Sequence, residues 1–290
     1  MQVTYKYPHK HGTFSLIYWI QDFYSIAVEN ILRIKLPIIS KPISFIFKYL
    51  DKKHLNKSDK IIIISKAFLK IINKWKIDSK KVLFIPNWGN LTSINKKKNE
   101  FQNFKTIYGI DNKKFTLVYT GTLALKHNPN LILDIAKKCK DIQIIIFGFG
   151  VGFENLKNYE NLYENLKLFP LQPFDKFIEI LNSADAFLAI LNEEAGEFSV
   201  PSKILNYLCA AKPIILSAPK NNLASEIINI SNSGKVFDKN ENKDIPEFIN
   251  LLKNDLNLRQ KLSINGRSYA EKNFNIEKIS KQFEDIIENI

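Results

Sequence analysis

The stretch from Glu193 to Pro213, EEAGEFSVPSKILNYLCAAKP, carries residue types at a spacing that could bind an anion. It follows an apolar run typical of a buried strand, and Ser199 and Pro201 predict the start of a helix. In that helix Ser199, Lys203 and Asn206 share one face at i, i+4 and i+7. A lysine beside the positive end of a helix favours phosphate. Taken alone, the stretch is more typical of an ordinary solvated helix face.

Alternating elements in the second part of the chain must position this stretch. Strands are predicted at 115–119, 142–147, 166–169, 186–191 and 213–217, and helices at 130–139 and 174–182. This alternation predicts an α/β fold with a parallel, doubly wound sheet. In such sheets ligands bind beyond the carboxyl ends of the strands. One cleft is therefore expected to be lined by residues 121–127, 148–152, 169–173 and 192–202. Two helices with no strand between them are predicted for 255–290.

The first part of the chain predicts a second, smaller set of strands and helices. Strands are expected at 14–20, 60–65 and 82–85, and helices at 24–34, 43–55 and 67–75. A polar, lysine-rich stretch follows at 89–111 and predicts a linker with a domain boundary near residue 90.

Cysteine and histidine usage excludes several classes of protein. The chain of 290 residues has only two cysteines, Cys139 and Cys209, both within apolar helical patterns. There is no CxxC pair, and the four histidines do not fall at metal-ligand spacing. A disulfide framework and a zinc site are therefore disfavoured, and a reducing compartment is expected.

Positive charge is concentrated in the first part of the chain. Residues 1–115 hold 22 Lys and Arg against 7 Asp and Glu, whereas residues 116–290 hold 20 against 22. This asymmetry indicates an acidic partner, namely an anionic membrane surface, a nucleic acid or a substrate with a pyrophosphate group. A simply solvated basic surface is the alternative.

A basic, apolar segment at 36–50 stands out within this part. Lys41 and Lys48 interrupt it, so it is too short and too charged to span a bilayer, but it could lie on a membrane surface. The competing interpretation is a helix that packs on its own domain. Residues 1–12 contain no signal-peptide core. We therefore expect a cytoplasmic protein, or one peripheral to the inner face of a membrane.

Several segments together resemble a known family, and they occur in its order and spacing over nearly the whole chain. The segments are WIQDFYS (19–25), IPNW (85–88), YTGTLALKHNP (119–129), LFPLQPFDKFIEILNSADAFLAIL (168–191) and GEFSVPSKILNYLCAAKPII (196–215). They resemble glycosyltransferase family 4, in particular the colanic-acid-type exopolysaccharide and lipopolysaccharide glycosyltransferases. The resemblance implies a GT-B fold of two Rossmann-like domains, one for a nucleotide-sugar and one for a saccharide or lipid-linked acceptor.

The resemblance also implies the domain limits. Residues 1–90 would form a partial N-terminal acceptor domain, 91–113 a linker, 114–275 the nucleotide-sugar domain, and 276–290 a helix crossing back. Family members have a longer N-terminal part, so the N-terminal domain is expected to be incomplete. The alternatives are a catalytically incomplete donor-binding chain, or one subunit of a split enzyme that a second chain completes.

The matched motifs imply the site residues that bind the donor diphosphate. Gly121 and Thr122 match a turn whose amides approach the diphosphate, and Lys126 matches a phosphate-binding base. Ser202 and Lys203 match the start of the helix that faces the pyrophosphate. Cations are needed there because negative charge develops on the leaving diphosphate.

The remaining site residues are implied for the sugar, the ribose and the base. Glu194 and Glu197 match the loop that contacts the donor sugar, and we predict catalytic roles for them. Asn206 stands where many relatives carry a glutamate for the ribose hydroxyls, and Phe169 and Leu171 match the position of the base. The resemblance implies transfer with retention of configuration, with no bound metal and no cofactor beyond the nucleotide-sugar.

Three other functions are weaker interpretations of the same sequence. The turn GFGVG at 148–152 lacks the full GxGxxG spacing and follows the second strand of its domain, so a Rossmann oxidoreductase is disfavoured. No helix-turn-helix, RNP or zinc pattern supports a nucleic-acid-binding module. A GT-B epimerase acting on the nucleotide-sugar alone is a further alternative.

Overall fold

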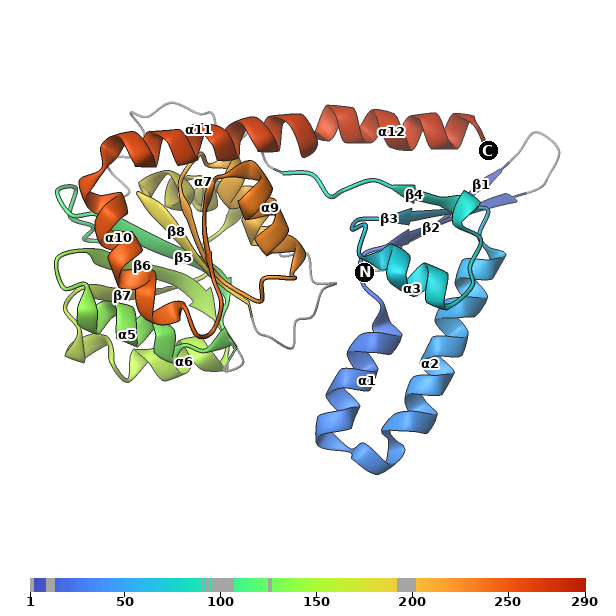
Figure 1. Ribbon diagram of the computed structural model, residues 1–290, viewed down its shortest axis with the longest axis horizontal. Helices are drawn as coiled ribbons and strands as arrows, with labels where there is room; N and C mark the ends of the chain where they lie inside the picture. The colour runs from blue at the N-terminus through green and yellow to red at the C-terminus, as the bar shows by residue number, and fades with distance from the viewer. Residues whose placement is uncertain are drawn as a thin grey trace. The chain divides into compact units, whose positions relative to one another are not determined.

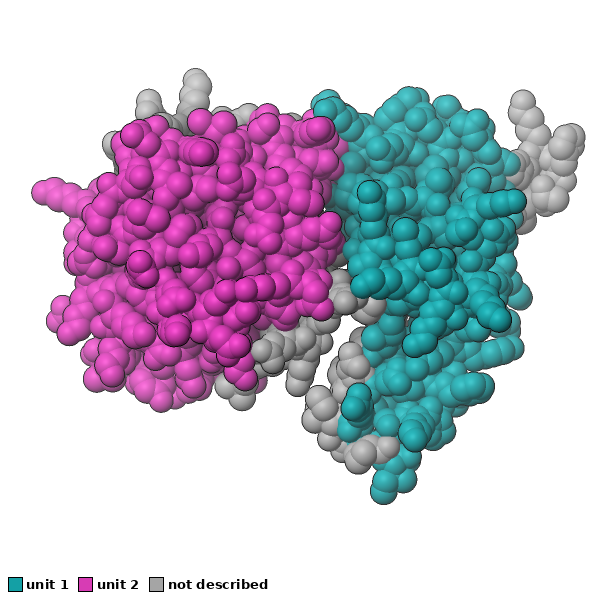
Figure 2. Space-filling view, in the orientation of Figure 1, with its two compact units in different colours: residues 1–87, 198–200, 277–290 teal, residues 88–197, 201–276 magenta. Residues whose placement is uncertain are grey.

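A computed structural model of the chain describes residues 3–8, 14–89, 91, 94, 107–124, 127–191 and 202–290. These residues form two compact units, coloured separately in Figure 2. Unit 1 holds the described residues up to 87 together with residues 277–290, and unit 2 holds the described residues from 88 to 276. The predicted linker, 91–113, lies largely outside the described residues.

Unit 1 is built on a four-stranded sheet of order β1-β2-β3-β4. The strands are β1 (Val3–Pro8), β2 (Phe14–Ile20), β3 (Lys60–Ile63) and β4 (Val82–Phe84). Strands β2, β3 and β4 are parallel, whereas β1 is antiparallel to β2. The helices of this unit are α1 (Tyr24–Lys35), α2 (Pro37–Lys57), α3 (Phe68–Lys74) and most of α12 (Ile276–Glu288), with a short 3-10 turn at Ser79–Lys81.

Apolar side chains cover both faces of this sheet. On one face Ile61 and Ile63 of β3 pack with Phe68 and Ile72 of α3. On the other face Ile279 of α12 joins the buried isoleucines of β2 and β3. Strand residues alternate between the two faces, so both need a helical cover.

Unit 2 is built on a six-stranded parallel sheet of order β10-β9-β8-β5-β6-β7 (Figure 1). The strands are β5 (Thr116–Thr122), β6 (Gln143–Phe149), β7 (Leu166–Pro170), β8 (Ala186–Ile190), β9 (Ile214–Ser217) and β10 (Gly234–Phe237). The order reverses between β5 and β8, as in a doubly wound Rossmann-like sheet. The α/β class and the parallel, doubly wound sheet expected for this part are confirmed.

Helices cover both faces of the second sheet. One face packs α7 (Phe174–Ser183), α8 (Ser202–Cys209), α9 (Leu223–Ser231) and part of α11 (Leu256–Asn273). The other face packs α5 (Asn130–Lys138), α6 (Val151–Lys157) and α10 (Ile245–Asn254). Short 3-10 turns lie at Glu160–Leu162 and Asn242–Asp244. Successive residues of β5 divide between the two cores: Val118 faces α8, whereas Leu117 and Tyr119 face α5.

The structure corrects several sequence-based boundaries. The strand β1 was not predicted, nor were α6, α9, β10 and α10. Helix α2 begins at Pro37 instead of residue 43, because a proline in the first turn needs no amide partner. Pro42 then lies inside α2 and is exposed. The two helices predicted for 255–290 are confirmed as α11 and α12.

Candidate functional site

The candidate site lies where the strand order of unit 2 reverses. Strands β5 and β8 are parallel neighbours there, and β5 ends at Gly121 and Thr122. Helix α8 follows β8 in the chain and begins, among the described residues, at Ser202 and Lys203. The carboxyl ends of the strands on either side of such a reversal leave a crevice for ligands. The structure therefore brings both halves of the predicted diphosphate site to this edge.

Gly121 and Thr122, predicted to form a turn after the strand, are the last two residues of β5, and Gly121 sets the backbone conformation where the strand ends. Its φ of 108° lies in a region that residues with a Cβ rarely adopt. A Cβ placed there would lie 3.7 Å from Nζ of Lys203, so the absence of a side chain also keeps the turn open toward that ammonium. The next residue, Thr122, is exposed.

Tyr119 connects this turn to Lys203. Its buried hydroxyl donates a 2.7 Å hydrogen bond to the carbonyl of Thr122 and accepts a 2.9 Å hydrogen bond from Nζ of Lys203. The same Nζ lies 4.0 Å from the centroid of the Tyr119 ring, within the range of a cation–π contact. Burial raises the pKa of the Tyr119 hydroxyl well above its usual range, so the phenol stays neutral. Tyr119 therefore aims the ammonium without neutralising it.

Lys203 has no carboxylate partner among the described residues. Its side chain is partly buried, and burial lowers its pKa to about 8 from the usual 10.5. Desolvation penalises the charged form of a lysine, and a bound anion would remove this penalty. An ammonium without a carboxylate partner, beside the open end of β5, is suited to a phosphate group.

Tyr207 attaches helix α8 to strand β5. Its hydroxyl accepts a 2.9 Å hydrogen bond from the amide of Thr120, and its ring stacks on Phe187 of β8 at 4.0 Å between centroids. Ile204, Leu205, Leu208 and Cys209 are buried, which confirms the predicted core face of this helix. The fixed apolar and aromatic face leaves Lys203 directed at the end of β5.

Arg267 of α11 holds the other end of α8. Its guanidinium donates to the carbonyl of Cys209 at 2.7 Å, where a helix leaves its last carbonyls without intrahelical partners. The same guanidinium pairs with Glu271 at 2.6 Å. Both ends of α8 are thus positioned by contacts with neighbouring elements.

The glycine-rich end of β6 and the residues that follow it pack against the end of β5 and the residues after it. A Cβ on Gly148 would approach the carbonyl oxygen of Gly121 to 2.9 Å, and one on Gly152 would approach Leu123 and Ala124 as closely. The amide of Phe153 also donates to the carbonyl of Leu123. The sequence disfavoured this turn as a dinucleotide fingerprint, and in the structure its glycines permit close backbone packing.

Phe169 and Leu171, predicted to lie near the base, are at the end of β7 and just beyond it. The Phe169 ring stacks on Phe147 at 5.3 Å and meets Tyr108 edge-on at 4.9 Å. Tyr108 in turn donates a 2.7 Å hydrogen bond to Gln172. Leu171 is exposed. Two strands separate β8 from β7, so these residues lie at the same sheet edge but on the far side of β5 and β6 from α8.

The structure leaves part of the predicted site undescribed. Lys126, Glu194, Glu197 and Ser199 lie outside the described residues. Asn206 is partly buried one helical turn after Ser202. The predictions for these side chains as ligands of the donor stay predictions.

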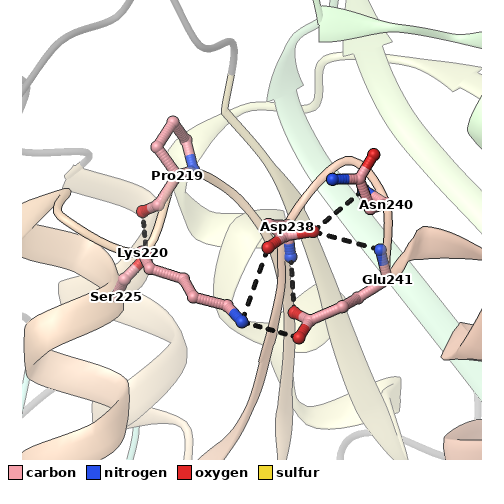
Figure 3. Close-up of polar contacts among 6 residues, drawn as sticks. All are labelled: Pro219, Lys220, Ser225, Asp238, Asn240 and Glu241. Carbon is pink, nitrogen blue, oxygen red and sulfur yellow. Dashed lines mark hydrogen bonds and ion pairs between the residues drawn. The ribbon is translucent and has the colours of Figure 1, made fainter.

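A second lysine at the carboxyl edge of this sheet has a different environment (Figure 3). Lys220, after β9, lies 2.6 Å from a carboxylate oxygen of Glu241 and 3.4 Å from one of Asp238, after β10. Hydrogen bonding to Glu241 raises the pKa of Lys220, and the two carboxyl groups have lowered pKa values. Amides of residues 240 and 241 also donate to Asp238. Carboxylates of the protein itself therefore neutralise the ammonium of Lys220.

Sequence reasoning missed the two tyrosines and the arginine that position the site. Tyr119 and Tyr207 lie within apolar runs, where a buried aromatic residue is ordinary core. A hydroxyl within such a run is the one available signal, because buried hydroxyls need partners. Nothing in the sequence indicated a role for Arg267. Cys209 is distant from it in the chain, and Glu271 is an ordinary i,i+4 neighbour on the same helix.

Comparisons with known proteins show which proteins this chain is similar to. A family model described as "Glycosyl transferases group 1" matches residues 100–269, more than half of the chain. An uncharacterized glycosyltransferase of Methanocaldococcus jannaschii, MJ1069, is 26% identical over 256 residues. That match includes 85% of this chain, and the chain spans 62% of the length of this curated relative.

Solved structures share the fold at low sequence identity. The Anabaena protein HepE, solved in complex with UDP and glucose, is 14% identical with a TM-score of 0.75, covering 95% of this chain and 72% of that one. WaaG, described as a glycosyltransferase involved in lipopolysaccharide biosynthesis, is 15% identical with a TM-score of 0.68, covering 93% and 74%. The predicted α/β fold of the GT-B class, with two Rossmann-like domains, is confirmed.

Proposed function

Because the chain belongs to the glycosyl transferases group 1 family, we propose that it transfers a sugar from a nucleotide-sugar donor to a saccharide or lipid-linked acceptor. The observation that carries the proposal is the arrangement of Lys203, Tyr119 and the Gly121 turn at the strand reversal of unit 2. It supplies an ammonium and an open backbone turn at the edge where ligands of doubly wound sheets bind. A donor diphosphate needs both.

Lys203 would act on the leaving group. As the bond from the sugar's anomeric carbon to the diphosphate breaks, the electron pair stays on the diphosphate oxygen and negative charge grows there. The acceptor hydroxyl oxygen forms the new bond to the anomeric carbon, and its proton passes to the departing diphosphate or to water. A fixed ammonium stabilises the charge that develops in this step more than the charge already present in the bound donor. Lys126 is proposed as the second cation.

The donor is proposed to be a uridine nucleotide sugar. The fold likeness to Anabaena HepE, solved with UDP and glucose, supports this choice. Phe169 and Leu171 would lie by the base and Asn206 by the ribose hydroxyls, with Glu194 and Glu197 at the sugar. Asn206 can donate and accept hydrogen bonds but gives no charge-assisted bond.

The acceptor is proposed to be a surface polysaccharide or its lipid-linked precursor. Support comes from the resemblance to exopolysaccharide-type enzymes and from the fold likeness to WaaG, described as acting in lipopolysaccharide biosynthesis. Transfer with retention of configuration and without a bound metal belongs to the same proposal, as does action at the cytoplasmic side of the membrane.

Binding and turnover measured together test this function. The first arm titrates the full chain with UDP and, as a comparison, ADP by calorimetry, where saturable UDP binding is expected. The second arm follows transfer from UDP-glucose and related donors to a lipid extract, with and without a chelator. Transfer that persists in the chelator and gives a product of the donor's own anomeric configuration supports the proposal.

The outcomes separate the alternatives. No binding of any nucleoside diphosphate would overturn the proposed site. Binding without transfer, with transfer restored by a companion chain, would replace the single-chain enzyme by one subunit of a split enzyme. Conversion of the donor with no acceptor present would indicate an epimerase or a hydrolase instead.

A further inference from the structure

Helix α2 of unit 1 is oriented with its polar side inward. Ser40, Ser44, Asp51 and Leu55 are buried at i, i+4, i+11 and i+15, which places them on one face of the helix. Asp51 accepts a 3.2 Å hydrogen bond from the amide of Ser25 in α1, and Ser44 donates to the carbonyl of Ser40. The inner face of α2 is therefore mostly polar or small.

The outer face of α2 is apolar. Ile38 is 91% exposed and Phe45 is 72% exposed. Ile39, Ile46, Tyr49 and Leu50 of this helix are exposed with them, and so is Phe47, which lies nearer the buried side. A helix on a soluble protein normally has the opposite arrangement, with apolar residues inward and polar residues outward. A contiguous exposed patch of this kind marks a site that contacts another surface.

Lysines continue and border the apolar face. Lys53 lies seven residues after Ile46 and Lys57 eleven residues after it, so both fall on the same side of the helix, and both are exposed. Lys41 is also exposed near the start of the helix. The one acidic residue of α2, Asp51, is buried and committed to the amide of Ser25. The exposed surface of the helix is therefore apolar and positive.

The pairing of α1 with α2 presents this face. The two helices pack along each other as a hairpin, and Lys48 of α2 pairs with Glu29 of α1 at 2.6 Å. Figure 1 shows the hairpin extending beyond the four-stranded sheet of unit 1. Helix α1 ends at Lys35 and α2 begins at Pro37, so Ile38 follows the connection between the helices. The apolar residues thus begin at the end of the hairpin remote from the sheet.

We propose that the outer face of α2 docks this protein onto an anionic lipid surface. Its apolar side chains would enter the boundary between headgroups and acyl chains, and its lysines would contact the negatively charged headgroups. None of the described helices has the length and hydrophobicity to cross a bilayer, so the contact is one of lying on the surface. This proposal does not depend on the sugar transfer proposed above.

Charge complementarity favours lipid over other occupants. A second copy of the chain, packed through the same face about a two-fold axis, would bring Lys53 and Lys57 of both copies into one interface. Like charges in a buried interface are unfavourable. A nucleic acid would complement the lysines but leave Ile38 and Phe45 without an apolar partner. An anionic lipid surface satisfies both properties at once.

Vesicle flotation with the purified full chain tests the proposal. The vesicles are phosphatidylcholine alone, or phosphatidylcholine in which about a third of the lipid is phosphatidylglycerol. We expect partitioning onto the anionic vesicles to be at least about tenfold stronger, because each lysine near such a surface contributes several-fold. Raising the salt concentration should weaken it, since salt screens exposed charges.

Two variants separate the apolar and the charged contributions. The double variant Phe45→Ser with Ile46→Ser should lose at least about tenfold in partitioning, because it removes two large side chains from the lipid boundary. The variant Lys53→Glu with Lys57→Glu should lose binding to anionic vesicles by a similar or larger factor. The matched controls are Ile264→Ser and Lys261→Glu on α11 in unit 2, both exposed, which should bind as the wild type does.

Several outcomes would overturn the proposal. Equal vesicle binding by the Phe45→Ser, Ile46→Ser variant and the wild type would show that this face is not used. A wild-type dimer that this variant converts to a monomer, with no vesicle binding by either, would assign the face to a second copy. Salt-sensitive RNA or DNA binding without vesicle binding would assign the lysines to a nucleic acid. Circular dichroism and thermal unfolding check that each variant is folded, which is expected because the substituted side chains are exposed.

Discussion

Two lysines at the carboxyl edge of the same sheet have opposite environments. Lys220 contacts the carboxylates of Glu241 and Asp238, and its pKa is raised by the hydrogen bond to Glu241. Lys203 contacts a neutral phenol and its ring, and burial lowers its pKa to about 8. The first ammonium already has its counter-charges, whereas the second has none among the described residues.

This difference indicates which lysine is available to a ligand. A phosphate approaching Lys220 would compete with two carboxylates and be repelled by them. A phosphate approaching Lys203 would relieve a desolvation penalty that the folded chain already carries. Both lysines lie near the strand ends, so position alone does not tell which one can bind a phosphate. Their hydrogen-bond and ion-pair partners do.

Removal of the Lys203 ammonium should have the largest effect on donor binding. We expect Lys203→Ala to weaken UDP binding by about ten- to a hundredfold, the range for a lost hydrogen bond to a charged group. Calorimetric titration measures it. The matched control is Lys235→Ala, which removes an ammonium lying 5.0 Å from the Phe237 ring on β10. An equal loss of UDP affinity in Lys203→Ala and Lys235→Ala would show that the effect does not depend on the position of Lys203 at the strand reversal.

The pH dependence of binding should report the same ammonium. In the free protein Lys203 loses its proton as pH rises through about 8, so UDP affinity should fall between pH 7 and pH 9 by up to about tenfold. In Lys203→Met the profile should be flat over this range. An unchanged wild-type slope in that variant would assign the pH dependence to another group.

The stability of the ligand-free chain should rise with pH over the range where UDP affinity falls. The pKa of Lys203 is about 8 in the folded chain against 10.5 as a reference, so between these values the unfolded chain binds the extra proton. Stability then rises with pH wherever the unfolded state binds more protons. Denaturant midpoints of wild type and Lys203→Met across this window measure the contribution of this residue. A wild-type midpoint that falls relative to the variant would contradict it.

The hydroxyl of Tyr119 should have a smaller effect. Tyr119→Phe keeps the ring under the ammonium but removes the hydrogen bonds to Lys203 and to the carbonyl of Thr122. UDP affinity should fall about two- to tenfold, because the ammonium stays over the ring and loses only the hydrogen bond that orients it. Tyr163→Phe, in a partly buried tyrosine packed on the same core, is the control. No change in the first variant would mean that the ring alone aims Lys203.

The smallest effect is expected at the neutralised lysine. Lys220→Ala should leave UDP affinity within about twofold of the wild type, because an exposed ion pair contributes little and its charges are satisfied internally. The same titration measures it. A loss as large as that of Lys203→Ala would show that the carboxylate cluster in Figure 3 does not mask Lys220.

The sequence predicted the fold of unit 2 better than that of unit 1. Alternating apolar runs and amphipathic helices gave β5 to β9 and the parallel sheet, since strands covered on both faces are continuously apolar. Strand β1 and the start of α2 were missed. The sequence predicted this helix to begin at residue 43, but Pro37 is the first residue of α2 and Pro42 lies on its exposed side.

The sequence by itself determined the chemistry available at the strand reversal: a glycine and threonine after one strand, and a serine and lysine at the start of a helix. It also determined the apolar and basic composition of α2. These follow from residue type and short-range spacing, which the chain carries directly.

Only the tertiary structure decided the state of each group. Tyr119 is 84 residues from Lys203 in the chain, yet the two share a hydrogen bond that leaves the ammonium charged and aimed. Lys220 is neutralised by residues of the following strand's loop, and α2 has its serines inward and its isoleucines outward. Partners and burial set pKa values and exposure, and both arise from contacts between elements distant in sequence.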